Sequence, residues 1–161
     1  MKTEIFKISE LSDESLSLIS RAADAIRNGG LVVFPTETVY GLGGDATNAS
    51  SSKKIYAAKG RPSDNPLIIH VAYPEDAEKY AYTTKLYYKL AERFMPGPLT
   101  VVLTSRATIP PETRGGLDTV AVRCPENVIA RAFIKASGVA IAAPSANLSG
   151  SPSPTDRKSV V

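Results

Sequence analysis

The chain has 161 residues, of which 43% are apolar and 22% are charged, so it can form one domain with a buried core and is too ordinary in composition for a disordered chain. Its net charge of +3 permits an anionic ligand but does not by itself indicate nucleic acid. The single cysteine, Cys124, excludes an internal disulfide and favours a location in the reducing cytoplasm. No apolar run approaches the roughly 18 residues that cross a bilayer, so no membrane partner is expected.

The N-terminal part of the chain predicts a short strand followed by a helix. Residues 4–8 alternate between polar and apolar side chains, as a half-buried strand does. A helix is predicted from Ser12, a good N-cap residue, to Asn28, and Gly29 ends it. The apolar face of this helix consists of Leu16, Ile19, Ala23 and Ile26.

Strands and helices then alternate along the chain. Residues 31–34 (LVVF) form a continuous apolar run, as in a strand buried on both faces, and Pro35 stops it. Further helices are predicted at 48–59, from Pro74, at 84–94 and at 125–137, with strands at 67–71, 100–104, 119–123 and 139–143. This alternation predicts an α/β (α+β) layered domain over residues 1–161. The two successive strands near 100–123 favour a mixed sheet over a purely parallel one.

Two loops that follow predicted strands are rich in hydroxyl, amide and glycine groups. They are PTETVYGLGG at 35–44 and PSANLSG at 144–150. Ligands of open sheets bind where loops converge beyond strand ends, although the same residue types are also common in ordinary turns. Two such loops in one small domain favour a binding site. The side chains they offer are Thr36, Thr38, Ser145, Asn147 and Ser149.

The most basic segment of the chain, residues 53–67, is predicted to hold an anion. Lys59 and Arg61 flank a glycine at a helix-to-loop junction, and in an extended loop residues two apart point the same way. Both side chains could then meet one phosphate or carboxylate, Arg61 as a planar fork and Lys59 as a compact charge. Lys53 and Lys54 fit the plainer alternative of a solvated helix end.

Several common sites are missing from the sequence. No glycine-rich loop ends in the Gly-Lys-Ser/Thr of a P-loop, and GLGG at 41–44 lacks the third glycine of the dinucleotide fingerprint. A lone histidine on a strand is more often structural than catalytic, although His70 would be a donor if it faced a cleft. Cys124 has no second cysteine or nearby histidine and is interpreted as a buried small residue.

Six motifs in order resemble the YrdC-like domain, the catalytic unit of L-threonylcarbamoyladenylate synthases. They are PTETVYGLG (35–43), KGRP (59–62), NPLIIHV (65–71), PGPLT (96–100), VAVRCP (120–125) and PSANLSG (144–150). The resemblance covers about residue 15 to residue 155. Six motifs at the family's spacing are far more specific than any one of them. They imply a twisted mixed sheet flanked by helices, with a concave, electropositive cleft.

The resemblance also implies a reaction. Synthases of this family combine L-threonine, bicarbonate and ATP, release pyrophosphate and form threonylcarbamoyl-AMP. Mg²⁺ is expected to accompany the ATP triphosphate, with no metal bound by the protein itself. A partner complex then transfers the threonylcarbamoyl group to tRNA. The expected partners are therefore ATP, L-threonine, bicarbonate, the transfer complex and tRNA or another double-stranded RNA.

Matched motif by motif, the family pattern implies two neighbouring subsites. L-Threonine would lie near Thr38, His70, Arg123 and the backbone of Ala143. ATP would lie near Arg61, Asn65, Thr119, Ser145, Asn147 and Ser153. Lys59 and Arg61 are the expected catalytic pair, which would hold bicarbonate or phosphate and offset charge during adenylyl transfer. Arg123 would be the fork for the threonine carboxylate.

Members of the family usually continue for some tens of residues past the PSANLSG motif. That stretch carries a further strand pair with one contact to threonine and one to the nucleotide. This chain ends at SPSPTDRKSVV (151–161), so weak or no synthase activity is expected from it.

Two other functions stay open at this point. A non-catalytic module that binds double-stranded RNA or tRNA would use the same basic cleft, although the chain has no Arg/Lys-rich arm and no aromatic stacking motif. An RNA complex that survives Lys59→Ala and Arg123→Ala would favour this module, whereas loss of threonine-dependent ATP binding would favour the enzyme. The related domain of hydrogenase-maturation carbamoyltransferases is the other alternative, but those proteins carry zinc-finger and acylphosphatase domains that this sequence lacks.

Overall fold

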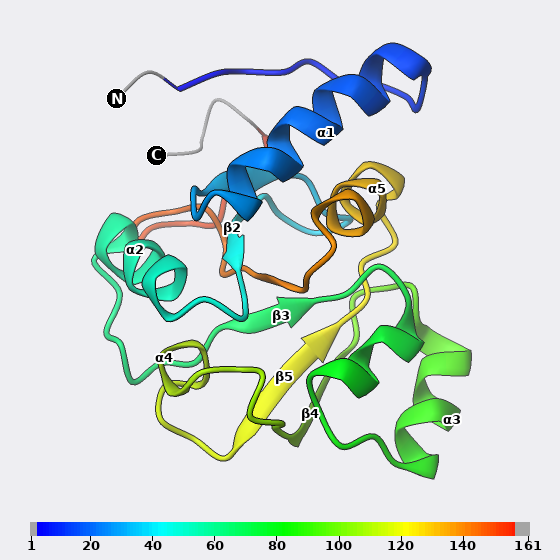
Figure 1. The fold of residues 1–161 in the computed structure, drawn as a ribbon, viewed down its shortest axis with the longest axis vertical. Helices are drawn as coiled ribbons and strands as arrows, with labels where there is room; N and C mark the ends of the chain where they lie inside the picture. The colour runs from blue at the N-terminus through cyan, green and yellow to red at the C-terminus, as the bar shows by residue number, and fades with distance from the viewer. Residues whose placement is uncertain (1–2, 157–161) are drawn as a thin grey trace.

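Six strands form one mixed sheet in the computed structural model, which describes residues 3–156 (Figure 1). The strands are β1 (Val32–Phe34), β2 (Gly41–Asp45), β3 (Ile68–His70), β4 (Thr100–Thr104), β5 (Thr119–Arg123) and β6 (Ile141–Ala142). Their order across the sheet is β1-β2-β6-β3-β5-β4. Strands β3 and β5 run parallel and the other neighbouring pairs are antiparallel, so the predicted mixed sheet is confirmed.

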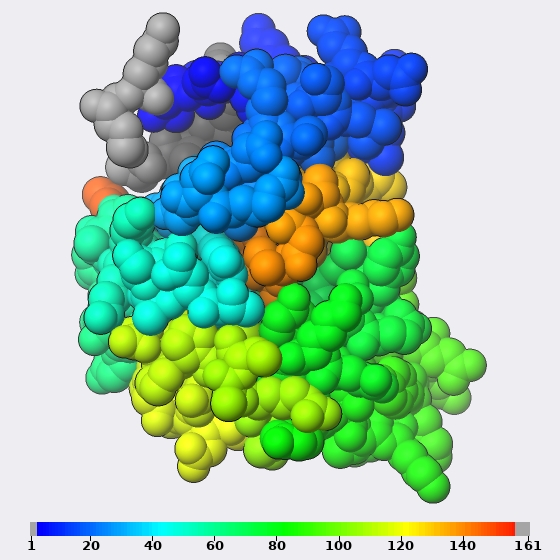
Figure 2. Space-filling model, viewed as in Figure 1, coloured from blue at the N-terminus to red at the C-terminus, as the bar shows by residue number. Residues whose placement is uncertain are grey.

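Helices cover both faces of this sheet. They are α1 (Asp13–Arg27), α2 (Ala49–Lys59), the 3₁₀ helix η1 (Pro74–Lys79), α3 (Lys85–Phe94), α4 (Pro111–Arg114) and α5 (Val128–Ser137). Successive residues of a strand point to opposite faces. Accordingly, Ile141 packs in a core cluster with α1 and α5, whereas Ala142 packs in a second cluster with α2 and α3. Figure 2 shows α5, in orange, between the blue residues of α1 and green residues that follow β3.

Helix α1 confirms the predicted helix and its caps. The hydroxyl of Ser12 accepts a hydrogen bond from the backbone N–H of Ser15 at 3.2 Å, and Gly29 has φ of +73° just beyond the last turn. One predicted position on the buried face is wrong, because Leu16 is 47% exposed and Ser15 lies inside. Ser15 lies one helical turn before the buried Ile19 and so on the same face, and its hydroxyl donates to the carbonyl oxygen of Ser12 at 3.0 Å.

The strand predicted at 4–8 is absent, and these residues pair with no strand of the described chain. They lie instead against α1 through side chains. Glu4 forms an ion pair with Arg21 at 2.8 Å, and the guanidinium of Arg21 stands 5.0 Å from the centre of the Phe6 ring. Ile8 packs against the core cluster that includes residues of α1. The polar–apolar alternation here therefore reflects contact with a helix surface and not a sheet ladder.

Three further expectations need correction. Strand β1 is the edge of the sheet, so Val33 is 36% exposed and the strand is not buried on both faces. Strand β2 takes up residues 41–44 of the PTETVYGLGG segment, which the sequence predicts to be loop throughout, and ends at Asp45. Helix α5 begins at Val128, not at Pro125, because the side chain of Asn127 accepts hydrogen bonds from two backbone N–H groups of the first turn.

The remaining predicted elements are confirmed, with shorter bounds for two strands. Strand β3 has three residues and β6 has two, against five predicted for each. Helices α2 and α3 begin one residue after their N-caps, Asn48 and Thr84. The short helix α4 has no counterpart among the predictions. No helix within residues 3–156 is both long and apolar enough to cross a membrane.

Candidate functional site

The two polar loops identified in the sequence lie side by side. The backbone N–H of Ala146 donates to the carbonyl oxygen of Tyr40 at 2.8 Å, and the N–H of Leu42 donates to Pro144 at 2.9 Å. Further along, the N–H of Tyr40 donates to the carbonyl oxygen of Pro154 at 2.9 Å. The loop after β1 is therefore held against the chain that follows β6, as the sequence predicts for a shared site.

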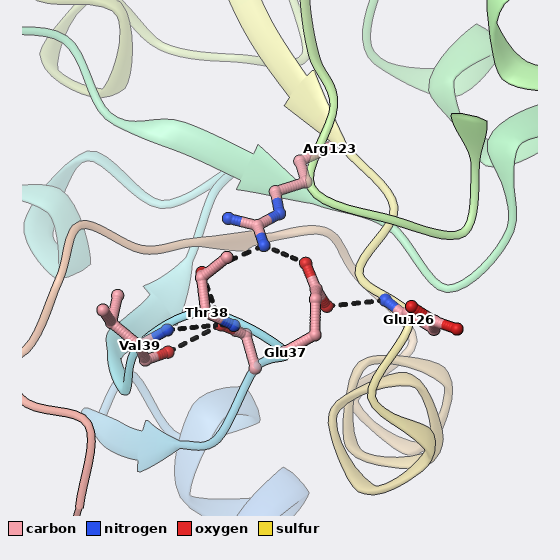
Figure 3. A network of polar contacts seen from close by, with 6 residues as sticks. Glu37, Thr38, Val39, Arg123 and Glu126 are labelled. Carbon is pink, nitrogen blue, oxygen red and sulfur yellow. Dashed lines mark hydrogen bonds and ion pairs between the residues drawn. The ribbon is translucent and has the colours of Figure 1, made fainter.

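Arg123 stands at the end of β5 and reaches into the loop after β1 (Figure 3). Its Nη2 donates to the Glu37 carboxylate and, at 3.1 Å, to the hydroxyl of Thr38. The second carboxylate oxygen of Glu37 accepts a hydrogen bond from the backbone N–H of Glu126 at 2.7 Å. One ion pair thus joins the loop after β1 to the connection between β5 and α5.

This ion pair is largely shielded from solvent and leaves the Nε of Arg123 without a hydrogen-bond partner. The side chains of Arg123 and Glu37 are 12% and 17% exposed. Burial alone would raise the pKa of Glu37, but hydrogen bonds from Arg123 and from the N–H groups of Glu37 and Glu126 hold that pKa below its usual value. The Nε of Arg123 is buried without a hydrogen-bond partner. An unpartnered guanidinium N–H beside an exposed hydroxyl provides donors for an oxygen atom of a ligand.

The loop that carries Glu37 and Thr38 is shaped by Thr36. The hydroxyl of Thr36 accepts hydrogen bonds from the backbone N–H groups of Thr38 and Val39, each at 3.2 Å, and donates to the carbonyl oxygen of Val39 at 2.6 Å. Such a threonine turn fixes the backbone locally. It also accounts for the presentation of two neighbouring side chains to Arg123.

His70 lies next to Arg123 on the parallel strand β3 and is almost completely buried. Its Nδ1 is 3.2 Å from the carbonyl oxygen of Ile68, which can accept a hydrogen bond from the ring, and the backbone of Ile141 offers the ring a second acceptor. Burial and the nearby Arg123 lower the pKa of His70 to about 4, so the ring is neutral at pH 7. The ring of Phe34 meets it edge-on with centroids 5.8 Å apart.

Lys59 joins α2 to the loop after β6. Its Nζ donates to the backbone carbonyl oxygens of Ser145 and Asn147, and its own carbonyl oxygen accepts from the N–H of Ser149 at 2.9 Å. The side chain is 4% exposed, and burial, with a smaller contribution from Arg61, lowers its pKa. Lys59 therefore holds the loop with two of its three N–H donors.

The expectation that Lys59 and Arg61 extend in parallel is wrong. Lys59 is the last residue of α2, and Gly60 turns the chain with φ of +58°. The guanidinium of Arg61 donates to the carbonyl oxygens of Asn65 at 3.3 Å and Pro66 at 3.2 Å. The two cations remain close enough for Arg61 to lower the pKa of Lys59, so they share a region but not a partner.

The residues expected around a nucleotide fall into separate places. Ser145 and Asn147 lie at Lys59, and the Oδ1 of Asn147 is buried without a hydrogen-bond partner. Asn65 lies at Arg61, and Ser153 is an exposed residue directly before Pro154. Thr119 begins β5 at the opposite end from Arg123, about 13 Å away at the rise of an extended strand.

The residues expected around threonine lie closer together. Thr38 contacts Arg123, and Arg123 neighbours His70 in the sheet. The N–H of Ala143 donates to the carbonyl oxygen of Ile68 at 2.9 Å, which sets Ala143 beside the same strand as His70. Sequence reasoning missed Glu37. A carboxylate between two threonines, in a motif predicted to share a site with an arginine, was the available signal.

Two hollows in the surface lie away from these residues. Both involve η1 or α5 and share Tyr73 and Lys135 in their linings. None of the residues predicted for the site lines either hollow. The concave basic cleft implied by the family resemblance stays a prediction.

Comparison with known proteins points to one family. The family model Sua5/YciO/YrdC, described as telomere recombination, matches residues 24–161. The threonylcarbamoyl-AMP synthase of Pyrococcus abyssi is 56% identical over 135 residues, and that of Bacillus subtilis is 50% identical over 144. These alignments cover 83% and 88% of this chain but only 40% and 42% of the relatives. The chain thus spans about two fifths of the length of these two relatives.

A solved structure of a related protein has the same fold as this chain. The structure of P. abyssi Sua5 complexed with L-threonine superposes with a TM-score of 0.86 and 52% identity. The superposition covers 89% of this chain and 43% of the other. The predicted twisted mixed sheet flanked by helices is therefore confirmed.

Proposed function

The chain belongs to the Sua5/YciO/YrdC family, and from that membership we propose that it forms threonylcarbamoyl-AMP and pyrophosphate from L-threonine, bicarbonate and ATP. The observation that carries the proposal is the Arg123 side chain. It is largely shielded from solvent at a strand end, has a buried, unpartnered Nε and donates to the hydroxyl of Thr38. The names of the two synthase relatives support the same reaction.

L-Threonine is proposed to bind at Arg123. The guanidinium would take the α-carboxylate through its free N–H groups, because arginine forms strong paired hydrogen bonds with carboxylates. Thr38 and the neutral ring of His70 would lie beside the threonine side chain, and the backbone of Ala143 would complete the subsite. The relative solved with L-threonine supports threonine as the amino acid.

ATP is proposed to bind along the loop after β6 and the Arg61 turn. The ligating side chains would be Arg61, Asn65, Thr119, Ser145, Asn147 and Ser153. The buried, unpartnered Oδ1 of Asn147 is an acceptor that a ribose hydroxyl could satisfy. Mg²⁺ would arrive on the triphosphate oxygens. The part of the chain that the structure describes has no group of three or more His, Cys, Asp or Glu side chains able to hold a metal ion.

The proposed chemistry needs positioning and charge stabilisation more than a protein nucleophile. The threonine amine attacks the carbon of bicarbonate, and loss of water (the departing hydroxyl with an amine proton) gives a carbamate. A carbamate oxygen then attacks the α-phosphorus of ATP and displaces pyrophosphate. Arg61 and the third N–H of Lys59 would stabilise the negative charge that develops on the phosphate oxygens. Lys59 would contribute a second time by fixing the loop that carries Ser145 and Asn147.

The proposed product is an intermediate in tRNA modification. A threonylcarbamoyl-transfer complex would receive it and modify tRNA, so the reaction belongs in the cytoplasm with its tRNA substrate. Direct contact of this chain with tRNA or double-stranded RNA would then be one binding step in this series of reactions and not a separate function.

The experiment is a pyrophosphate-release assay with ATP, bicarbonate and Mg²⁺, with and without L-threonine. Threonine-dependent release that disappears in Arg123→Ala and persists in Arg93→Ala supports the function. Arg93 is the matched control because it is an exposed arginine on α3, far from both loops. Release that is independent of threonine, or unchanged in Arg123→Ala, would count against it. The rate, set against a full-length relative, tests the expectation of weak turnover.

A further inference from the structure

Glu37 is the one carboxylate paired with Arg123 within residues 3–156, and both of its oxygens are engaged. One oxygen accepts from the guanidinium, and the other accepts from the backbone N–H of Glu126 at 2.7 Å. The acid is thereby fixed beside the guanidinium from two sides (Figure 3). Because hydrogen bonds favour its charged form, Glu37 stays anionic at neutral pH.

The fixed pair changes what Arg123 can bind. Arginine and glutamate together carry no net charge, so an arriving carboxylate gains the guanidinium but meets the anion of Glu37 within a few ångströms. With side chains only 12% and 17% exposed, this repulsion is screened less than on an open surface. A bare carboxylate is thus a poor ligand for the pair.

A zwitterionic amino acid meets no such obstacle. Its ammonium group is attached to the carbon next to the carboxylate. When the carboxylate lies on Arg123, the ammonium is brought close to the anion that shares the same guanidinium. We propose that Glu37 makes the Arg123 site selective for a zwitterionic α-amino acid over carboxylates without an ammonium group. This inference rests on the proposed function, which places threonine at Arg123, and it adds a specificity-determining residue to that site.

The test compares two ligands by isothermal titration calorimetry at constant salt. They are L-threonine and 3-hydroxybutanoate, which has the threonine skeleton without the amine. The wild-type protein is expected to bind threonine more tightly. In Glu37→Gln, which keeps the shape and removes the charge, the ratio of the two affinities should fall by about tenfold. A merely structural role of Glu37 would weaken both ligands alike and leave the ratio unchanged.

Two further variants separate charge from folding. Glu37→Asp retains the anion and should keep most of the wild-type ratio even if its contact with Arg123 is looser. Glu75→Gln removes an exposed carboxylate whose charge reaches the neighbouring Cys124, and should leave the ratio as it is. Thermal unfolding of each variant confirms that the protein compared is folded.

The outcomes distinguish the two proposals. If the wild type binds threonine and Glu37→Gln keeps the full ratio, the inference about Glu37 is overturned and the proposed function stands. An equal loss of the ratio in Glu37→Asp would also overturn it, since the charge would then not be the cause. If the wild type binds neither ligand, the threonine subsite at Arg123 is wrong and both proposals fall.

Discussion

His70 is the one histidine of the chain, and its burial gives the fold a pH dependence of its own. Burial lowers the pKa of His70 from 6.5 to about 4 in the folded protein. Between these two values the histidine is protonated in the unfolded chain and neutral in the folded one. The contribution of neutral His70 to the free energy of unfolding is fully present above pH 6.5 and is lost as the pH falls towards 4. Between pH 7 and pH 5 the loss should be about 2 kcal/mol.

Urea unfolding at pH 7, 6 and 5 measures this loss. His70→Gln is the matched variant, because it keeps a polar side chain and removes the titrating ring. We expect its free energy of unfolding to change little over this interval. A wild-type slope that persists in His70→Gln would assign the pH dependence to carboxylates instead.

Lys59 offers a second prediction at the scale of one side chain. In Lys59→Met the carbonyl oxygens of Ser145 and Asn147 lose a charged donor inside the protein, which should cost about 2 kcal/mol of unfolding free energy. Lys53→Met is the control, since Lys53 is 69% exposed and makes only a 3.5 Å ion pair with Glu112. Its cost should stay below about 0.5 kcal/mol. Chemical denaturation measures both changes in unfolding free energy. Equal losses in Lys59→Met and Lys53→Met would show that the hydrogen bonds of Lys59 do not stabilise the loop after β6.

Side chains were predictable from the sequence where chemistry narrows the choice. The hydroxyl residues of two loops were identified from their position after strands, and Arg123 from the family resemblance; the structure brings Arg123 and Thr38 into contact. Glu37 was missed although it stands between two threonines of a candidate site, because its partner Arg123 lies 86 positions further along the chain and the ion pair is visible only in the fold. The pairing of Lys59 with the loop after β6 was missed for the same reason, since Ser145 lies 86 positions after Lys59.

At the scale of elements, β2 shows why a strand can escape sequence analysis. Glycines are poor strand residues, so GLGG predicts a loop. In the structure the glycines leave room for neighbours. A Cβ on Gly43 would lie 2.6 Å from the Cγ2 of Ile141 and 2.9 Å from the Phe34 ring. The strand exists because tight packing against β6 and β1 favours it, which no local pattern reveals.

This packing predicts that two glycines of one strand respond differently to alanine. Gly43→Ala must push aside Ile141 or Phe34 and should destabilise the fold by about 2 kcal/mol. Gly41→Ala places its Cβ at 3.4 Å from Ala143 and Phe34, an ordinary contact, and should cost much less. Thermal unfolding of both variants is the measurement. If Gly41→Ala is as destabilising as Gly43→Ala, the cause would be the loss of glycine flexibility and not the close contact of the added Cβ.

Helices were predicted better than strands because their signals are local. Periodic apolar residues and capping side chains lie within the same short stretch, as with Ser12 and Gly29 around α1. The start of α5 was misjudged only by the choice of cap, which is Asn127 and not a proline at the first turn. The strand at 4–8 failed because alternation does not say what the segment packs against.

At the scale of the whole molecule, the proposed threonine subsite exists only when distant parts of the chain are assembled. Arg123 comes from β5, Glu37 and Thr38 from the loop after β1, and His70 from β3. Since unfolding scatters these groups, a ligand bound among them must stabilise the entire fold. L-Threonine at about 100 times its dissociation constant should add about 2.7 kcal/mol to the free energy of unfolding. For a domain of this size that corresponds to a rise of about 8 °C in Tm.

Differential scanning fluorimetry of the wild type and Arg123→Ala over a threonine titration measures the rise. The wild-type midpoint should climb with the logarithm of threonine concentration, because the stabilisation follows mass action once the site is filled. The midpoint of Arg123→Ala should stay flat, since the variant removes the guanidinium that would hold the carboxylate. Parallel rises in both proteins would mean that threonine acts as a general stabilising solute. The fold would then be that of the family, and the assembled Arg123 site would not be where threonine binds.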